Sequence, residues 1–322
     1  MTNYQVYKKT LSFSLVLFCI DVLSLVVVAG LAVVGFFALD KSTDKAIIGL
    51  IIGLIVGIII SVVIKIFITN RVKAGQIGMM AKGVTDDELP DAPFKAGLEE
   101  VKGRFGKLTA FFFVINAIKG VFRQIGRTFT RFGQAVGGDV GGGIMSAIDS
   151  AIQTVISYLA DCCLGWVMYN KNTGTARAAC EGAAIFFKHG KTLVRNIGRI
   201  FIISFISLVI IGGAFFGIAY GLFQLNPDLF APLANEIAEA AARGESSNPE
   251  WLTVPGNLAL IIAAVIGLVM YGIIHSVFIR PFILVGVLRN FMAEGIKEKP
   301  TEQDFAILDG KSAKFAKLHS EA

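Results

Sequence analysis

Few ionisable side chains lie inside the apolar parts of this 322-residue chain, and each of them is therefore a candidate for chemistry. A charged or titratable group within a hydrocarbon layer is energetically costly, so by default it marks a path for an ion, a proton or a solute. Four such groups lie in or beside long apolar runs, and we predict that they are polar residues of a transport path. They are Asp21, Asp149, Asp161 and His275.

Each candidate also has a purely structural interpretation. Asp21 would lie at the inner interface of the membrane if the first span begins at Val22. The polar positions from Ser146 to Asp161 fall on one helical stripe, which could line a watery path or face the cytoplasm while the opposite side rests on lipid. We favour the second of these. His275 is a lone histidine near the end of an apolar run, where a hydrogen-bonded packing role is common.

The residue spacings that metal or covalent chemistry requires do not occur in the sequence. The histidines, His189, His275 and His319, are far apart and have no ligand-spaced partner. The glycine-rich stretch 137–143 lacks the motif orders of phosphate-binding loops, and no GxSxG elbow occurs. The four cysteines have neither a CxxC pair nor regular spacing, so a disulfide framework is not expected. We predict that the protein is not an enzyme and binds no metal and no cofactor.

Composition places the chain in a membrane. Hydrophobic residues make up 54% of it and charged residues only 17%, with a mean hydropathy of +0.68. Soluble domains carry about 25% charged residues. The formal net charge is +6, and the basic residues lie mostly beside apolar runs, where they set orientation and contact anionic headgroups. We therefore expect anionic lipids, and not nucleic acid, as partners.

Four apolar runs are long enough to span a bilayer as helices. The positive-inside rule puts their lysine- and arginine-rich ends in the cytoplasm and the acidic loop 224–257 outside. Both termini are then cytoplasmic, in a bacterial inner membrane or a plasma membrane. The predicted spans are Leu11–Leu39 with Ala46–Thr69, and Ile200–Phe223 with Leu258–Val277.

The predicted fold class is all-α: a polytopic membrane helical bundle of four spans in two hairpins, with amphipathic helices on the cytoplasmic side. Residues 109–169 leave room for two further crossings. The expected segments are a first transmembrane hairpin (1–74), a cytoplasmic or interfacial region (75–199), a second hairpin (200–288) and a cytoplasmic tail (289–322).

Small residues recur at every fourth position in two of the spans. Such a flank lets another backbone approach closely, although glycine is common in membrane helices in any case. This glycine-zipper spacing predicts that the two helices pack against each other. The predicted helix-packing residues are Gly49, Gly53, Gly57, Gly213, Gly217 and Gly221.

Basic residues recur every fourth position between Thr109 and Phe132, opposite an apolar side that includes Ile118. This pattern is typical of an amphipathic helix that lies in the headgroup layer of an anionic membrane. The predicted headgroup contacts are Lys119, Arg123, Arg127 and Arg131.

Two pairs of sequence words indicate an internal repeat. VIKIFI at Val63–Ile68 is paralleled by FIRPFI at Phe278–Ile283, and MAKGV at Met80–Val84 by MAEGI at Met292–Ile296. The hairpins would then be parallel repeats that both begin in the cytoplasm. Chance similarity between apolar sequences is the alternative.

From Lys171 to Met292 the order of features resembles the carboxy-terminal part of choline-transporter-like proteins. The matching words are LVRNIGRIF at Leu193–Phe201 and YGIIHSVFIRPFILVGVLRN at Tyr271–Asn290. The resemblance implies a permease for a small organic solute such as a cation. The chain has fewer spans than that family and lacks its acidic motif after the last span, so neither choline nor any binding residue is carried over.

The functional prediction is therefore an integral membrane permease. The alternative is a non-transporting membrane protein that organises anionic lipid or recruits a partner, and the third interpretation is a channel built on the glycine-lined helices. A homo-oligomer is compatible with each of these.

Overall fold

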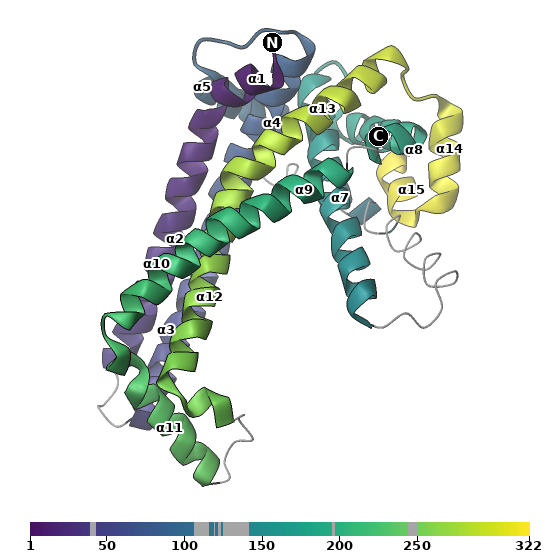
Figure 1. Ribbon diagram of the computed structural model, residues 1–322. Helices are drawn as coiled ribbons and strands as arrows, with labels where there is room; N and C mark the ends of the chain where they lie inside the picture. The colour runs from purple at the N-terminus through teal and green to yellow at the C-terminus, as the bar shows by residue number, and fades with distance from the viewer. Residues whose placement is uncertain are drawn as a thin grey trace. The chain divides into compact units, whose positions relative to one another are not determined.

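The structure, a computed structural model, describes residues 1–38, 43–105, 116–118, 120–121, 124, 142–194, 197–243 and 250–322. These residues are largely helical, and no strand occurs among them (Figure 1). The predicted all-α class is confirmed. Four helices are long and apolar enough to cross a membrane, as an integral membrane protein requires. They are Leu11–Ala38, Ile48–Thr85, Ile200–Gln224 and Pro255–Lys297.

The described chain divides into two compact units. Unit 1 comprises Met1–Ile197 and Pro281–Ala322, and unit 2 comprises Gly198–Arg280. This grouping differs from the four segments expected from the sequence. Unit 1 joins the first hairpin, the 75–199 region and the tail, because helices far apart in the chain pack together there.

The first hairpin in unit 1 consists of α2 (Leu11–Ala38) and α3 (Thr43–Ile64), which pack side by side (Figure 1). We call the end where α2 begins and α3 ends its base, and the opposite end its tip. The two backbones meet at glycines. A Cβ added at Gly53 would lie 2.8 Å from the carbonyl carbon of Leu31, and one at Gly57 would lie 2.8 Å from the Cα of Val28. Small residues at these positions permit this close approach.

The glycine face of α3 therefore has a different neighbour from the one predicted. It is occupied by α2 of the same hairpin, where Gly35 meets the backbone of Gly49. The fourfold spacing marks a close helix contact but carries no information about which helix makes it. Sequence proximity through a short connection decides the partner here.

The second helix of the hairpin continues well beyond a membrane span. A π-helix, η1 (Lys65–Thr69), follows α3 and leads directly into α4 (Asn70–Thr85). The stretch Ile48–Thr85 is 38 residues long, whereas a span needs roughly 20. The α4 part is packed in protein, with Ile77, Met79 and Met80 fully buried. The segment expected to connect from residue 75 thus begins inside a helix that ends at Thr85.

Eight helices of unit 1 form what we call the base domain. They bury the largest fully buried side chains of the described residues, among them Phe291, Phe305, Phe315 and Met168. The helices are α1 (Asn3–Lys9), α4, α5 (Pro93–Phe105), α7 (Gly142–Tyr169), α8 (Thr175–Val194), α13 (Arg280–Lys297), α14 (Glu302–Lys311) and α15 (Ala313–Ser320).

Unit 2 is the second hairpin. Its first arm is α9 (Ile197–Ser207), the π-helix η2 (Leu208–Gly212) and α10 (Gly213–Gln224), and its second arm is α12 (Pro255–Ile274) followed by the π-helix η5 (His275–Ile279). Between the arms lie η3 (Pro227–Phe230), α11 (Ala231–Ala242) and η4 (Glu250–Thr253).

The arms of unit 2 approach each other at glycines outside the predicted series. A Cβ added at Gly267 would lie 2.7 Å from the carbonyl oxygen of Gly212 and 3.1 Å from the Cβ of Phe216. In contrast, no described atom lies within 4 Å of a Cβ built at any member of the predicted series. Those members are Gly213, Gly217 and Gly221. The π-helix η2 ends at Gly212, and its wider turn rotates the residues of α10 relative to those of α9. Glycine spacing in the sequence does not reveal this rotation.

Candidate functional site

Asp21 forms an ion pair with Lys65 across the first hairpin. The Lys65 Nζ lies 3.6 Å from the Asp21 Oδ1, and the Asp21 side chain is only 13% exposed. Asp21 is about 17 residues from the tip end of α2 at Ala38, which is about 26 Å along a helix. A hydrocarbon layer roughly 30 Å thick that begins at the tip end of α2 would therefore end near this pair. This position favours the interface interpretation of Asp21 over a path through the layer.

Further polar contacts continue the same seam between the hairpin helices. On the tip side of the pair, the Ser61 hydroxyl donates to the Ser24 carbonyl oxygen at 3.3 Å. On the base side, the buried Gln76 amide donates to the Ser14 hydroxyl at 2.9 Å and reaches the Thr10 carbonyl oxygen at 3.5 Å. Except at the Ser24 hydroxyl, these groups satisfy one another, as polar groups in a membrane hairpin must. The seam holds the hairpin together.

Asp161 forms a second ion pair, in the base domain. The Lys73 Nζ lies 3.2 Å from the Asp161 Oδ2, and the Asp161 side chain is 9% exposed. Residues 158–168 of α7 are buried without exception, with α4 and α8 packed against this helix. Both interpretations of the polar stripe are therefore wrong for this part of it, because protein covers the helix on more than one side. The side chain of Asp149 lies outside the described residues.

His275 belongs to a polar cluster in unit 2. Its Nε2 lies 3.1 Å from the Ser204 hydroxyl. The Ser204 carbonyl oxygen accepts hydrogen bonds from the Tyr271 hydroxyl at 3.1 Å and from the Ser207 hydroxyl at 2.8 Å. The cluster lies beside both π-helices of the unit, where backbone groups depart from the regular α-helical ladder and hydroxyls can satisfy them. Within unit 1, Asp21 and Asp161 are not brought into one site, since they pair with different lysines, and His275 belongs to unit 2.

The predicted headgroup residues, Lys119, Arg123, Arg127 and Arg131, lie outside the described residues. Their described neighbours contact protein. Ile118 and Val121 are buried, and the Gln124 Oε1 accepts a hydrogen bond from the Ser312 hydroxyl at 2.9 Å. The expectation that Ile118 faces lipid is therefore wrong. The tail helix α15 lies close to this stretch, since a Cβ at Gly120 would contact the Lys314 side chain, and no local pattern indicates this.

Three cysteines are buried in the base domain. Burial raises the pKa of Cys180 to about 12 and holds the pKa of Cys163 well above its usual value. Cys162 is also fully buried. Thiols that stay protonated and shielded are poor nucleophiles, so these residues act as packing groups.

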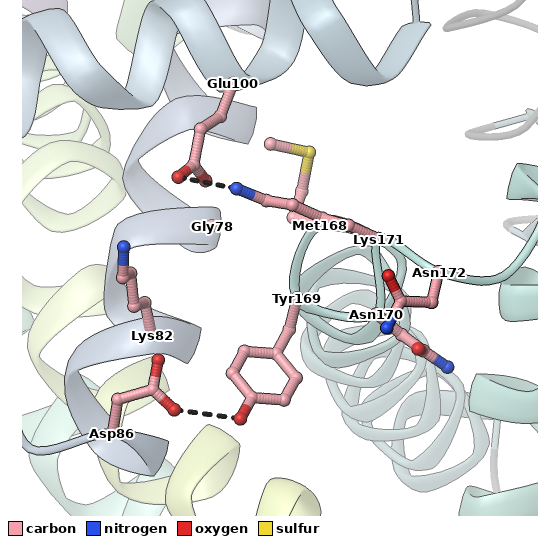
Figure 2. A pocket seen from close by; sticks show the side chains of 9 residues that line it. All are labelled: Gly78, Lys82, Asp86, Glu100, Met168, Tyr169, Asn170, Lys171 and Asn172. Carbon is pink, nitrogen blue, oxygen red and sulfur yellow. Dashed lines mark hydrogen bonds and ion pairs between the residues drawn. The ribbon is translucent and has the colours of Figure 1, made fainter.

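The cavity shown in Figure 2 is the site that sequence reasoning missed. It has a volume of about 360 Å³ and is lined by residues of α4 and α5 and by the turn after α7. Across it, the Tyr169 hydroxyl donates to the Asp86 Oδ1 at 2.8 Å, and the Lys171 Nζ lies 2.9 Å from the Glu100 Oε1. Burial and the hydrogen bond to Asp86 raise the pKa of Tyr169. No spacing in the sequence links these residues, because they come from three separate segments.

Within the described part of the chain, no cluster of histidine, cysteine and carboxylate side chains is placed to hold a metal ion. No protein-family model, no curated protein and no solved structure matches the chain.

Proposed function

We propose that the protein anchors a helical domain at the inner face of a membrane and associates there with anionic lipid, without carrying a solute across. One observation carries this proposal. The apolar segments 22–38, 46–64, 200–224 and 255–274 contain no aspartate, glutamate, lysine, arginine or histidine. In the first hairpin, Asp21 and Lys65 directly adjoin segments 22–38 and 46–64, and they form an ion pair with each other.

A conduit for a charged solute needs polar groups at mid-depth, because the solute must exchange its hydration for protein contacts there. The two hairpins offer none with a charge. Asp21 and Asp161 are each within 4 Å of a lysine ammonium, which neutralises them as sites for a cation.

The composition of the base domain also supports the anchor proposal. Its core consists of the extensions of the membrane helices, such as α4, together with helices from the middle and the end of the chain. The loop 224–257 carries five acidic residues and Arg243 alone, so the positive net charge of the chain comes from the rest of the sequence. Basic residues next to an anionic membrane surface contribute about 1 kcal/mol each.

Solute uptake by purified protein in liposomes tests the first half of the proposal. We expect no uptake of amines, amino acids or inorganic ions above that of protein-free vesicles. Saturable uptake that Asp21→Asn or Asp161→Asn reduces would refute the anchor proposal.

Lipid association is tested by energy transfer from the protein to labelled anionic lipid in mixed vesicles. Replacing Lys8 and Lys9, which are exposed at the end of α1, by Gln should lower the enrichment of anionic lipid, as should Gln at Arg123, Arg127 and Arg131. The matched control replaces the exposed Lys95 and Lys102 of α5. Equal enrichment in all variants would contradict the proposal.

A permease is the second candidate, and the Ser204, Tyr271 and His275 cluster favours it. A histidine that shares hydrogen bonds with hydroxyls of a facing helix could exchange a proton or bind a solute. If uptake is found, His275→Ala and Ser204→Ala should abolish it while Ser276→Ala, on the same π-helix, should not.

We also propose that the two halves are an internal repeat, because their elements follow in the same order. In one half, α3, the five-residue η1, α4 and α5 follow one another, with Pro90 before α5. In the other half the order is α12, the five-residue η5, α13 and α14, with Pro300 before α14. Each π-helix begins with a nitrogen-bearing side chain, Lys65 or His275. An experimental structure in which residues 43–105 and 255–311 do not superpose would contradict the repeat.

A further inference from the structure

The cavity in Figure 2 is a half-open pocket in the base domain. Its volume of about 360 Å³ lies in the range of small-molecule sites, which starts at roughly 300 Å³. Gly78 and the buried Met168 lie against each other at one side, since a Cβ at Gly78 would approach the Met168 side chain to 3.1 Å. Polar and charged side chains supply the other walls.

The turn that closes the cavity is held by Arg104. Its guanidinium donates to the carbonyl oxygens of Val167 at 3.0 Å, Asn170 at 3.1 Å and Thr173 at 2.6 Å. Val167 is in the last turn of α7, where carbonyl groups lack helical partners, and Asn170 and Thr173 belong to the turn that follows. The Asn170 amide also donates to Glu181 at 2.9 Å. The wall is therefore preorganised, and a ligand need not order it.

The charges around the cavity are unevenly paired. Glu100 and Lys171 neutralise each other at 2.9 Å. Lys82 is in the last turn of α4, and the exposed Asp86 follows directly after the helix, one turn further on. Within the described part of the chain neither side chain forms an ion pair. Among the described residues, the Asp86 carboxylate accepts a hydrogen bond from the neutral Tyr169 hydroxyl. A base that precedes an acid by four residues is the less favourable order for pairing along a helix.

We propose that this cavity binds a small zwitterion of the type of a free α-amino acid. The ammonium of Lys82 receives the ligand carboxylate and the carboxylate of Asp86 receives the ligand ammonium, so one molecule satisfies both charges. The Asn170 and Asn172 amides border the same space and supply further hydrogen bonds.

The ligand comes from the aqueous phase. Lys82 lies about 17 residues beyond Lys65 on one continuous helix, which is about 26 Å from the base-side boundary of the hydrocarbon layer. A lipid headgroup does not extend that far. The inference goes beyond the anchor proposal and does not depend on it, because binding is measured without a membrane gradient.

Calorimetry and thermal shift on the full-length protein in detergent test the site. The probes are the proteinogenic amino acids and glycine betaine, with the N-acetyl and methyl-ester forms of each amino acid that binds. We expect at least one zwitterion to bind, and its singly charged forms to bind at least tenfold more weakly. Absence of binding by every zwitterion, or equal binding of the N-acetyl form, overturns the proposal.

Variants locate the site. Lys82→Met and Asp86→Asn should each weaken binding at least tenfold, and Asp86→Asn keeps an acceptor for Tyr169. The exposed Lys102→Met and Glu99→Gln on α5 are matched controls that should bind as the parent protein does.

The exchanged double variant, Lys82→Asp with Asp86→Lys, separates recognition from net charge. It keeps the charge of the cavity but puts the acid before the base, the order that pairs along a helix. Binding should be lost while the melting temperature without ligand is retained. Undiminished binding by this variant or by either single variant overturns the assignment.

Discussion

Adding one methyl group to the first hairpin should stabilise the protein at one glycine and not at another. At Gly53→Ala the new Cβ would lie 2.8 Å from the carbonyl carbon of Leu31 and would overlap the carbonyl oxygen. At Gly30→Ala, in the facing helix of the same hairpin, no described atom lies within 4 Å of the new Cβ. The two variants share their chemistry and differ only in whether another backbone is in contact.

The expected magnitudes follow from two competing effects. Alanine favours a helix interior over glycine by up to ~1 kcal/mol, and this gain applies at both sites. At Gly53 the backbones must move apart by about 0.7 Å or more to restore a carbon contact near 3.5 Å. Overpacking of this kind costs about 1–3 kcal/mol. Gly30→Ala should therefore raise the free energy of unfolding, and Gly53→Ala should lower it or leave it unchanged.

Titration with SDS in mixed micelles, followed by circular dichroism, measures the free energy of unfolding for each variant. We expect the free energy of unfolding of Gly53→Ala to be about 1–3 kcal/mol lower than that of Gly30→Ala, which is the size of the overpacking cost. Variants that change stability equally, in either direction, would refute the reasoning that backbone contact at Gly53 holds this hairpin.

Three further predictions concern the base domain. Arg104→Gln removes hydrogen bonds to the carboxyl end of α7 and should lower the free energy of unfolding by about 1.5 kcal/mol, because the guanidinium is half-buried. Lys73→Met should destabilise by about 3 kcal/mol, since the Asp161 carboxylate is too deeply buried to be hydrated, whereas Asp161→Asn should cost about 1 kcal/mol because Lys73 can turn to water. The hydrogen bond and the charge of Lys188 hold the pKa of Glu298 below its ordinary 4.5, so this stabilisation is complete above pH 4.5 and is lost as the pH falls through the lowered value.

The corresponding measurements are thermal and denaturant unfolding of purified protein. An Arg104→Gln protein as stable as the parent would contradict the capping role. A larger loss of stability for Asp161→Asn than for Lys73→Met would contradict the inference that Asp161 is the more deeply buried member of the pair. For the pH prediction, Lys188→Met should reduce the acid sensitivity between about pH 5 and pH 3, and an unchanged acid profile would contradict it.

The sequence by itself determined the membrane-spanning helices. The length of an apolar run and the absence of charge within it are local properties of the sequence. A lipid bilayer imposes its requirement for apolar side chains on each residue of a span separately, so the four spans are predictable from the sequence alone. The positions of Lys65 and His275 near the ends of those runs were also visible for this reason. The hydropathy pattern did not predict the π-helices that begin at these residues, because one wider turn does not change which residues of a span are apolar.

Tertiary structure decided which residues meet. The spacing around Gly53 indicated a close contact, but only folding showed that α2 supplies it. Asp161 lies on a stripe that suggests exposure, yet α4 and α8 cover it and Lys73 pairs with it. The cavity between Lys82 and the turn after α7 has no sequence signature at all. Contacts between segments far apart in the chain depend on the geometry of several helices at once, and local periodicity does not contain that geometry.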